Sequence, residues 1–333
     1  MRLTGDSPSG SIWLTWIKVG CDFWRDGTEP ILRCRRRFMI KHILVLLDGD
    51  AADERALNAA FTLAKLFHGH VEVFHVRPDP RLAIPPIAEG FSSDMLERLI
   101  REAEQADQER ASHARRSFDA AVASAGIHSV GYPDADTAIA SGSITATWRE
   151  MVGQPEDILT QRGRCADLLL FAQPFDAPAN VLRLETALFE TGQPILLAAP
   201  GMDGEALSSI AIAWDGSRQA ARAIAGAMPL LRRARNATIL TVDGGDDVNG
   251  PTAPMITCLS DHLAWHGISV AVDVLHKDGR PTGELLTGRA TEIGAGLLVM
   301  GGYGHSRFRE MVLGGATRHV LGTALECSVL IAH

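Results

Sequence analysis

An internal repeat limits what this chain can fold into more than any other feature of its sequence. The apolar run Ile43 to Leu47 ends in Asp48-Gly49-Asp50, and the run Ile210 to Trp214 ends in Asp215-Gly216-Ser217. In both halves an alanine-rich helical stretch follows, and then a second apolar run. In the first half these are Ala51 to Phe67 and Val71 to Val76, and in the second half Gln219 to Ala234 and Thr238 to Val242. The pattern predicts strand, helix and strand twice over.

The later parts of the two halves match as well. Residues 166–172 parallel residues 295–301, and Ile195 to Ala198 parallels Val329 to Ala332, while Ala146 to Val152 and Val270 to Leu275 are the candidates for third strands. Apolar runs without alternation are typical of parallel strands that helices cover on both faces. Five strands alternating with helices therefore predict, in each half, a parallel, doubly wound α/β sheet, whose ligands bind where loops leave the carboxyl ends of the strands.

Length and composition favour two domains preceded by an extension. A chain of 333 residues suits two domains, which we place at residues 39–203 and 204–333. Residues 1–38 hold three of the six tryptophans and a cluster of arginines, and Gly20, Cys21 and Asp22 interrupt any signal-peptide core. We therefore expect residues 1–38 to be a non-domain extension, with Met39 as the native start.

The first half carries an insertion relative to the second. It consists of the proline-broken segment Pro78 to Pro86 and a long helical stretch, Asp94 to Ala125. The charged face of this stretch predicts a solvated surface with pairs at i and i+4, and a surface for a protein partner is the alternative.

Charge and cysteine usage exclude several classes of function. A formal net charge of -8 and a pI near 5.8 argue against binding to nucleic acid. The five cysteines are dispersed, without a Cys-x-x-Cys pair, which argues against a metal site and favours reduced thiols in the cytoplasm. No apolar run approaches the ~20 residues of a membrane span, so we expect no membrane association.

A glycine-rich segment follows the fourth predicted strand of the second half. It reads Gly301-Gly302-Tyr303-Gly304-His305-Ser306-Arg307, and Gly314-Gly315-Ala316-Thr317 comes shortly afterwards. Glycines at a strand exit let backbone N–H groups converge on an anion, and a helix that begins near Gly315 would point its N-terminal amides at the same place. The segment predicts a polyphosphate site, with a loop that only maintains the fold as the alternative.

The spacing of these glycines resembles the nucleotide loop of the universal stress protein family: Gly301-x-x-Gly304, nine residues, then Gly314. The Asp-Gly turns and the apolar last strands are also similar, so the resemblance covers nearly everything from Met39 onward. It implies two tandem flavodoxin-like (Rossmann-like, adenine nucleotide alpha hydrolase-like) domains of five strands each. They would pair as an intramolecular pseudo-dimer, and a homodimer of two chains stays open.

The same resemblance implies a ligand and the residues that hold it. The ligand would be ATP, with or without Mg²⁺. The residues bordering the adenosine would be Ala213, Trp214, Asp215 and Val242. The residues around the ribose and phosphates would be Met300, Gly301, Gly304, Gly314, Gly315, Ala316 and Thr317, with His305, Ser306 and Arg307 beside them.

The sequence departs from the family pattern at Gly315, where Ser or Thr is expected. Losing one hydroxyl donor to a charged partner costs about 1.5 to 3 kcal/mol, which weakens affinity by about 10- to 100-fold. Thr317, Ser306 and Arg307 are candidates to compensate. The first half reads Gln173-Pro174-Phe175-Asp176 after its fourth strand and has no glycine pair there, which predicts a degenerate domain.

Other polar residues have structural and functional interpretations. Asp215 either binds ribose or magnesium or caps the helix at Gln219, and Asp48 is expected to cap its own helix. His75 and His276 have no carboxylate or second histidine at ligand spacing, so a metal site is not expected. No nucleophile motif is present. We expect an ATP-binding regulatory or stress-response protein with an unknown protein partner, against a nucleotide-free scaffold or a slow ATPase.

Overall fold

The computed structural model describes residues 39–78, 93–131, 143–173, 178–243, 252–302, 315–323 and 325–333. These residues belong to one compact unit, Phe38–His333. The N-terminal extension, with the expectation about Met39 as the native start, lies outside the described residues, and so does the segment 303–314 with most of the glycine loop.

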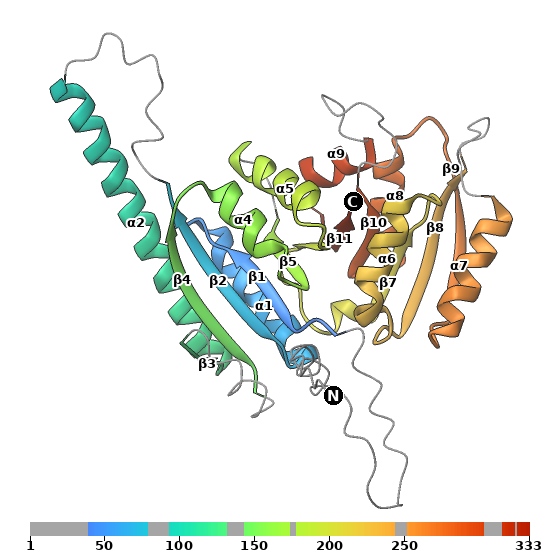
Figure 1. Ribbon diagram of the computed structural model, residues 1–333. Helices are drawn as coiled ribbons and strands as arrows, with labels where there is room; N and C mark the ends of the chain where they lie inside the picture. Colours follow the sequence, from blue (N-terminus) through green and yellow to red (C-terminus); the bar gives the residue numbers. More distant parts are fainter. Residues whose placement is uncertain are drawn as a thin grey trace, which may run out of the picture. The chain divides into compact units, whose positions relative to one another are not determined.

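The first half alternates strands and helices (Figure 1). Its elements are β1 (His42–Leu46), α1 (Ala52–Phe67), β2 (His70–Arg77), α2 (Ser93–Ala125), β3 (His128–Ser129), β4 (Thr145–Val152), α4 (Pro155–Gly163), β5 (Leu168–Ala172), α5 (Pro178–Glu190) and β6 (Ile195–Ala198).

The second half repeats this order after a short 3₁₀ turn, η1 (Ala206–Ser208). Its elements are β7 (Ser209–Ala213), α6 (Arg218–Leu231), β8 (Asn236–Asp243), α7 (Ala253–Trp265), β9 (Ala271–His276), α8 (Thr282–Glu292), β10 (Leu297–Gly301), α9 (Gly315–Gly322) and β11 (Ser328–Ala332). The strands lie where the apolar runs predict them, including the third strands β4 and β9.

The described strands form one eleven-stranded sheet in the order β3-β4-β2-β1-β5-β6-β11-β10-β7-β8-β9. In each half the first strand lies between the second and the fourth, and all pairs within a half are parallel. The halves meet through β6 and β11, which pair antiparallel with Leu196 opposite Leu330. The predicted tandem, doubly wound α/β fold is confirmed, except that the two-residue strand β3 adds a sixth strand to the first half.

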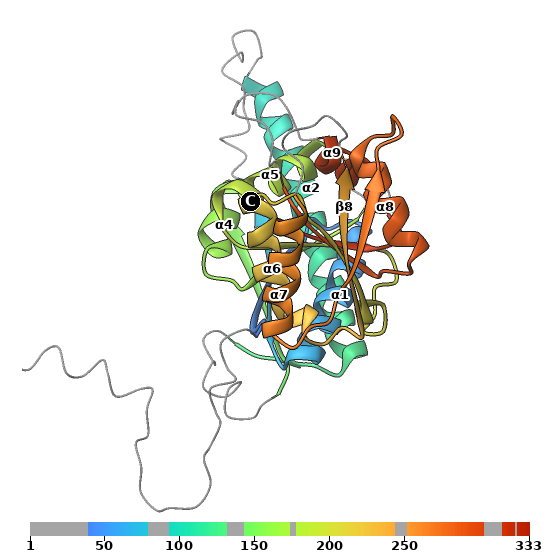
Figure 2. The same ribbon diagram turned by 90° about the vertical axis from the view of Figure 1, so that its right-hand side faces the viewer.

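Helices cover both faces of this sheet. Figure 2 shows α6 and α7 on one side of β8 and α8 on the other. One buried apolar cluster includes Phe61 of α1, Phe118 of α2 and Leu263 of α7, and the other includes Leu159 of α4 and Leu286 of α8. Each cluster draws residues from both halves, so the two halves share their hydrophobic core.

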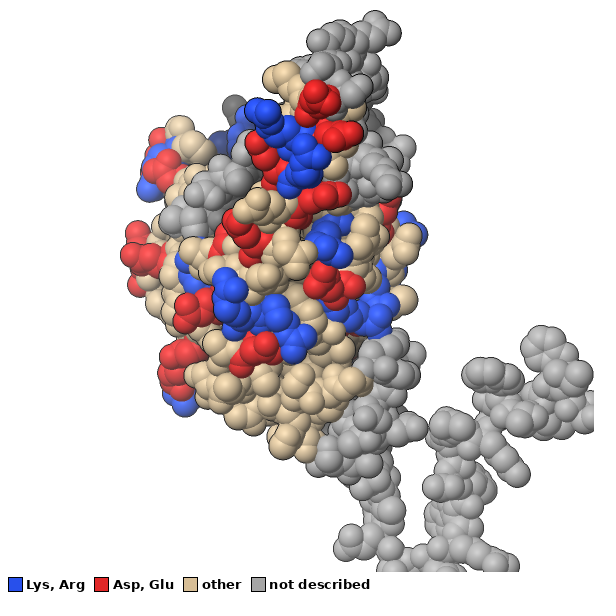
Figure 3. Space-filling view, turned by 90° about the vertical axis from the view of Figure 1, so that its left-hand side faces the viewer, with Lys and Arg blue, Asp and Glu red and all other residues tan. Residues whose placement is uncertain are grey.

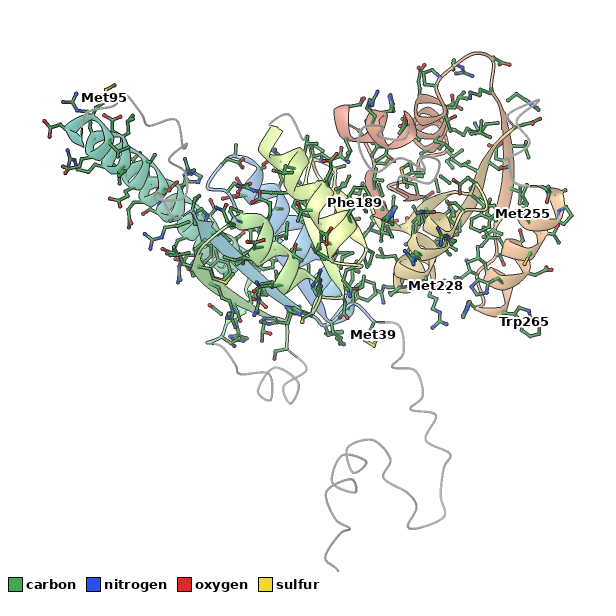
Figure 4. The ribbon with its side chains drawn as sticks, turned by 45° about the horizontal axis from the view of Figure 1, so that its top comes forward. Met39, Met95, Phe189, Met228, Met255 and Trp265 are labelled. Atoms are coloured by element: carbon green, nitrogen blue, oxygen red, sulfur yellow. The ribbon has the colours of Figure 1, made fainter. Side chains whose placement is uncertain are left out.

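Close contacts join the halves on both sides of the β6–β11 pair. On one side the guanidinium of Arg233 lies 5.8 Å from the ring centroid of Phe67. A Cβ added to Gly226 of α6 would lie 2.8 Å from Cβ of Pro194, so the helix approaches the first half too closely for a side chain there. On the other side Phe189, labelled in Figure 4, packs edge-on against His333 with 4.8 Å between ring centroids.

The long helix α2 has two different surfaces. Ala114 and Phe118 are buried against the sheet. The opposite side mixes acidic and basic side chains (Figure 3), with ion pairs such as Arg101–Glu97 at 3.2 Å and Arg115–Asp119 at 2.9 Å. The predicted solvated face with pairs at i and i+4 is confirmed. None of the described helices is both long and apolar enough to cross a membrane.

Candidate functional site

The carboxyl ends of β10, β7 and β8 lie next to one another in the sheet. The chain runs from β7 outward through β8 to β9 and then returns to the other side of β7 as β10. Loops therefore diverge between β7 and β10, which is the switch point where doubly wound sheets bind ligands. Ala213 at the end of β7, Val242 near the end of β8, and Met300 and Gly301 at the end of β10 all reach this edge.

The Asp-Gly turn after β7 leads into helix α6. The backbone N–H of Trp214 donates to the carbonyl of Leu240 at 2.9 Å, which extends the β7–β8 ladder by one residue. The carboxylate of Asp215 accepts from the N–H of Ser217 at 2.9 Å, and Ser217 caps α6 through its Oγ, which accepts from Ala220 N at 3.1 Å. The helix cap is thus Ser217, so the interpretation of Asp215 as the cap is wrong, and Asp215 instead orders the turn.

Trp214 lies beside this turn and is half-buried. Its indole Nε1 is buried and makes no hydrogen bond within the described part of the chain. Met255 of α7, labelled in Figure 4, covers the turn, because a Cβ on Gly216 would lie 2.2 Å from its Cε. Sequence reasoning missed Met255, since only the packing of α7 brings it to this place.

Gly301 is a glycine because helix α6 passes close to it. A Cβ at this position would lie 2.5 Å from Ala220 N and 2.8 Å from Gln219 C. These are backbone atoms of the first turn of α6, so they have little freedom to move away. Gly301 therefore seats α6 against β10, a packing role that exists whether or not a ligand binds.

The first turn of α9 supplies the other side of the candidate site. Gly315 is exposed, and an added Cβ would meet no atom of the described residues within 4 Å, whereas Thr317 is buried with 2% of its surface exposed. Ala316 between them is half-buried. The most exposed of these three first-turn positions is thus Gly315, where the sequence lacks the expected hydroxyl.

Helix α8 holds α9 in place. A Cβ on Gly283 would lie 2.9 Å from Cα of Ala316, so the two helices touch through their backbones. His319 Nε2 lies 3.2 Å from Thr287 Oγ1. Gly283 and Thr287 were not singled out from the sequence, because their role depends on a helix contact that is not local in the chain.

Several predicted site residues lie outside the described part of the chain: Gly304, His305, Ser306, Arg307 and Gly314. Among the described residues no group of three or more His, Cys, Asp or Glu side chains is arranged to hold a metal ion. One sequence interpretation needs correction here, because His276 Nδ1 lies 3.7 Å from Asp243 Oδ2. Both side chains are exposed, and β8–β9 pairing brings these residues opposite each other.

The related place in the first half has different chemistry. The carboxylate of Asp48 forms an ion pair with Arg183 of α5, so the expectation that Asp48 caps α1 is wrong. A hollow of only about 30 Å³ remains, lined by Asp48, Asp50, Asp53 and Arg183 among others. Helix α2 covers the turn, because a Cβ on Gly49 would lie 2.4 Å from the carbonyl oxygen of Arg110. Three carboxylates in so small a space disfavour a phosphate.

Asp53 holds the turn of the first half together. Its carboxylate accepts from Asp48 N and Gly49 N at 3.0 Å each, and only 3% of the residue is exposed. Burial raises the pKa of Asp53 to about 7, and the charge of Asp50 adds to this, although the two backbone hydrogen bonds lower it. The side chain therefore takes up a proton on folding at mildly acidic pH.

This raised pKa predicts a pH dependence of stability. The folded state binds the proton more tightly than the unfolded chain, so the contribution of Asp53 to stability falls as pH rises from about 4 to about 7. At pH 8 the penalty relative to pH 5 is about 2 to 4 kcal/mol. In denaturant titrations the stability of Asp53→Asn relative to the wild type should increase between pH 4 and pH 8, because only the wild type loses the proton over this range. Parallel curves over this range would contradict the prediction.

Comparisons with known proteins agree with this fold. Residues 39–140 match the model of the universal stress protein family. The crystal structure of a universal stress protein from Archaeoglobus fulgidus DSM 4304 is similar with a TM-score of 0.58 and 15% identity, covering 89% of this chain and 97% of that chain. A functionally unknown protein from Pseudomonas aeruginosa PAO1 is similar with a TM-score of 0.51 and 15% identity, and the match covers 88% of this chain and 92% of that chain. A search of curated proteins finds no match.

Proposed function

We propose that this chain is a universal stress protein, as the match of residues 39–140 to the model of that family suggests, and that it is a regulatory protein that binds ATP in its second half. The family match falls on the first half, whereas the glycine loop that fits a polyphosphate follows β10 in the second. The proposal therefore assigns different tasks to the two halves. The second half binds the nucleotide, and the first half packs against it and shares its hydrophobic core.

The observation that carries this proposal is the contrast between two related positions. In the second half the N-terminus of α9 carries Gly315, where an added Cβ would meet no atom of the described residues within 4 Å, and α9 follows β10, the neighbour of β7 in the sheet. In the first half an Asp48–Arg183 ion pair and two further aspartates fill the place after β1. A helix N-terminus with free space attracts an anion, and a cluster of carboxylates repels one.

The adenosine would lie over the ends of β7 and β8, near Trp214 and Val242. Asp215 would face the ribose or a Mg²⁺ ion on the phosphates, and the backbone amides from Gly301 to Thr317 would hold the phosphates. A slow ATPase is the second candidate, and it predicts phosphate release that disappears in Asp215→Ala. A nucleotide-free scaffold predicts no binding at all. The dispersed cysteines fit a protein of the cytoplasm.

Calorimetric titration of the full chain with ATP and Mg²⁺ tests the proposal. We expect saturable heat for the wild type and its loss in Gly304→Val, because a β-branched side chain displaces the loop backbone from the phosphates. Gly288→Val is the matched control, since Gly288 is exposed on α8 and a Cβ there meets nothing within 4 Å. Equal heats from wild type and Gly304→Val, or none from the wild type, would contradict the proposal.

A further inference from the structure

Gln173 reaches from the first half into the second. It follows β5 directly, and only 1% of its surface is exposed. Its backbone N–H donates to Ala198 O at 2.9 Å, which extends the β5–β6 ladder. Its side chain continues past β6 to the segment that joins α9 to β11.

The side-chain amide of Gln173 binds this segment with both of its ends. Oε1 accepts from Leu325 N at 3.1 Å. Nε2 donates to Cys327 O at 3.5 Å and to Leu197 O of β6 at 3.4 Å. A buried backbone N–H needs an acceptor, and Gln173 supplies it to Leu325 from a residue 152 positions away.

The second half has no glutamine at the position that matches Gln173. Gly302 is the counterpart of Gln173 in the second half, because it follows β10 and donates to Ala332 O at 2.8 Å. A Cβ on Gly302 would lie 3.0 Å from Cδ1 of Ile331 and 3.1 Å from Cδ2 of Leu188. The site is tight for any side chain, and because this residue is a glycine, the second half has no counterpart of the Gln173 amide.

Helix α9 is therefore held from both halves. Gly283 and Thr287 of α8 contact its body, and Gln173 fixes the chain that leaves its C-terminal end. Gln173 is itself anchored, because its carbonyl accepts from Arg55 Nε of α1 at 3.2 Å. The chain that leaves the C-terminal end of α9 is thus held by a residue of the half that carries no glycine loop.

We propose that Gln173 is a positioning residue for the nucleotide site of the second half. This inference rests on the proposed ATP binding at α9. The amide of Gln173 keeps the α9–β11 segment, and with it the N-terminal turn of α9, in the orientation that phosphate binding requires. The two halves then form a single binding unit, in which the degenerate half contributes to affinity without contacting the ligand.

The test compares Gln173→Met with a control of similar structural cost. Methionine has nearly the same length and cannot hydrogen-bond to Leu325 or Cys327. Thr191→Val is the control, because Thr191 is buried in the first half and its hydroxyl bonds only within that half, to Ala187 O and Gln193 N. Both variants lose buried hydrogen bonds, and only Gln173→Met loses a contact to the second half.

Calorimetry with ATP and Mg²⁺ at a temperature where all three proteins are folded gives the first readout. We expect the Kd of Gln173→Met to rise by about fivefold to tenfold, the equivalent of one hydrogen bond, and that of Thr191→Val to stay within about twofold. Amide hydrogen exchange gives the second. The Leu325 amide should exchange faster in Gln173→Met and at the wild-type rate in Thr191→Val.

The outcomes separate the two proposals. If the wild type binds ATP and Gln173→Met binds it equally well, the positioning role is wrong while ATP binding stands. An equal loss of affinity in Thr191→Val would also overturn it, because general destabilisation would then explain the effect. If the wild type binds no ATP, the proposed function fails, and the positioning role fails with it.

Discussion

Replacing Glu72 with glutamine is expected to lower the free energy of unfolding by about 3 kcal/mol, because it removes the buried counter-charge of half-buried arginine and histidine side chains. Glu72 of β2 is 1% exposed. Its carboxylate lies 3.1 Å from His42 Nε2 and 3.2 Å from Arg149 Nε, and it forms a further ion pair with Arg162 of α4. These contacts tie α4 to three neighbouring strands, so the loss is expected in chemical denaturation at neutral pH.

The pKa values of this cluster give the prediction a pH signature. Burial alone would raise the pKa of Glu72, but hydrogen bonds from His42 and Arg162 outweigh it and hold the pKa below its usual value. Its stabilisation is therefore present above the unfolded pKa and is lost as pH falls through the folded one. The stability difference between wild type and Glu72→Gln should shrink in acid.

His42, the histidine partner of Glu72, sets the upper end of the pH range over which this ion pair stabilises the fold. Burial lowers the pKa of His42, yet the hydrogen bonds with Glu72 and with the carbonyl of Cys165, together with the charges of Glu72 and Asp167, outweigh it and raise the pKa above its usual value. The contribution of His42 is complete below the unfolded pKa and is lost as pH rises through the raised one.

Glu205→Gln is the matched control for Glu72. Its carboxylate pairs with Arg235 at 2.8 Å, a shorter distance than the His42–Glu72 contact, but both side chains are about 70% exposed. An exposed pair contributes less than about 1 kcal/mol, so this variant should unfold almost like the wild type. Equal losses in the two variants would mean that burial does not govern the energy of these ion pairs.

The sequence predicted the strands because their signal is local. Continuous apolar runs identified β1, β2, β5 and β6 and their partners in the second half, and the alternation of strands with helices implied a parallel, doubly wound arrangement in each half. The two-residue strand β3 escaped prediction, since His128 and Ser129 are exposed polar residues without an apolar run.

Contacts between distant residues could not be predicted in this way. Glu72 is a charged residue within an apolar strand, and its partners come from β1, β4 and α4, so no spacing in the sequence joins them. The same holds for Gln173, whose partners are in the other half. At the candidate site, the family resemblance implied Ala213 and Asp215, and the glycine-rich segment at a strand exit indicated Gly301. Met255 and Gly283, in contrast, reach the site only through the packing of α7 and α8.

The second large effect is expected at Gly315, where Gly315→Ser should tighten ATP binding by about 10- to 100-fold. The variant restores a hydroxyl donor at the first turn of α9, and a charged acceptor such as a phosphate makes that hydrogen bond worth about 1.5 to 3 kcal/mol. The described part of the fold should tolerate the change, since a Cβ on Gly315 meets none of its atoms within 4 Å. Calorimetric titration of the full chain with ATP and Mg²⁺ measures the difference directly.

Gly315→Ala separates the hydroxyl from the backbone effect of losing a glycine. Alanine favours the helix by about 1 kcal/mol relative to glycine, so both variants pre-order α9, and only serine adds a donor. If Gly315→Ser binds ATP no more tightly than Gly315→Ala, no phosphate lies at this turn.

Gly301→Ala is expected to behave differently from the variants at Gly315. Its Cβ would lie 2.5 Å from Ala220 N, so this variant should lose stability even without a ligand. The two glycines thus differ in kind, since one is required by packing and the other leaves room for a ligand.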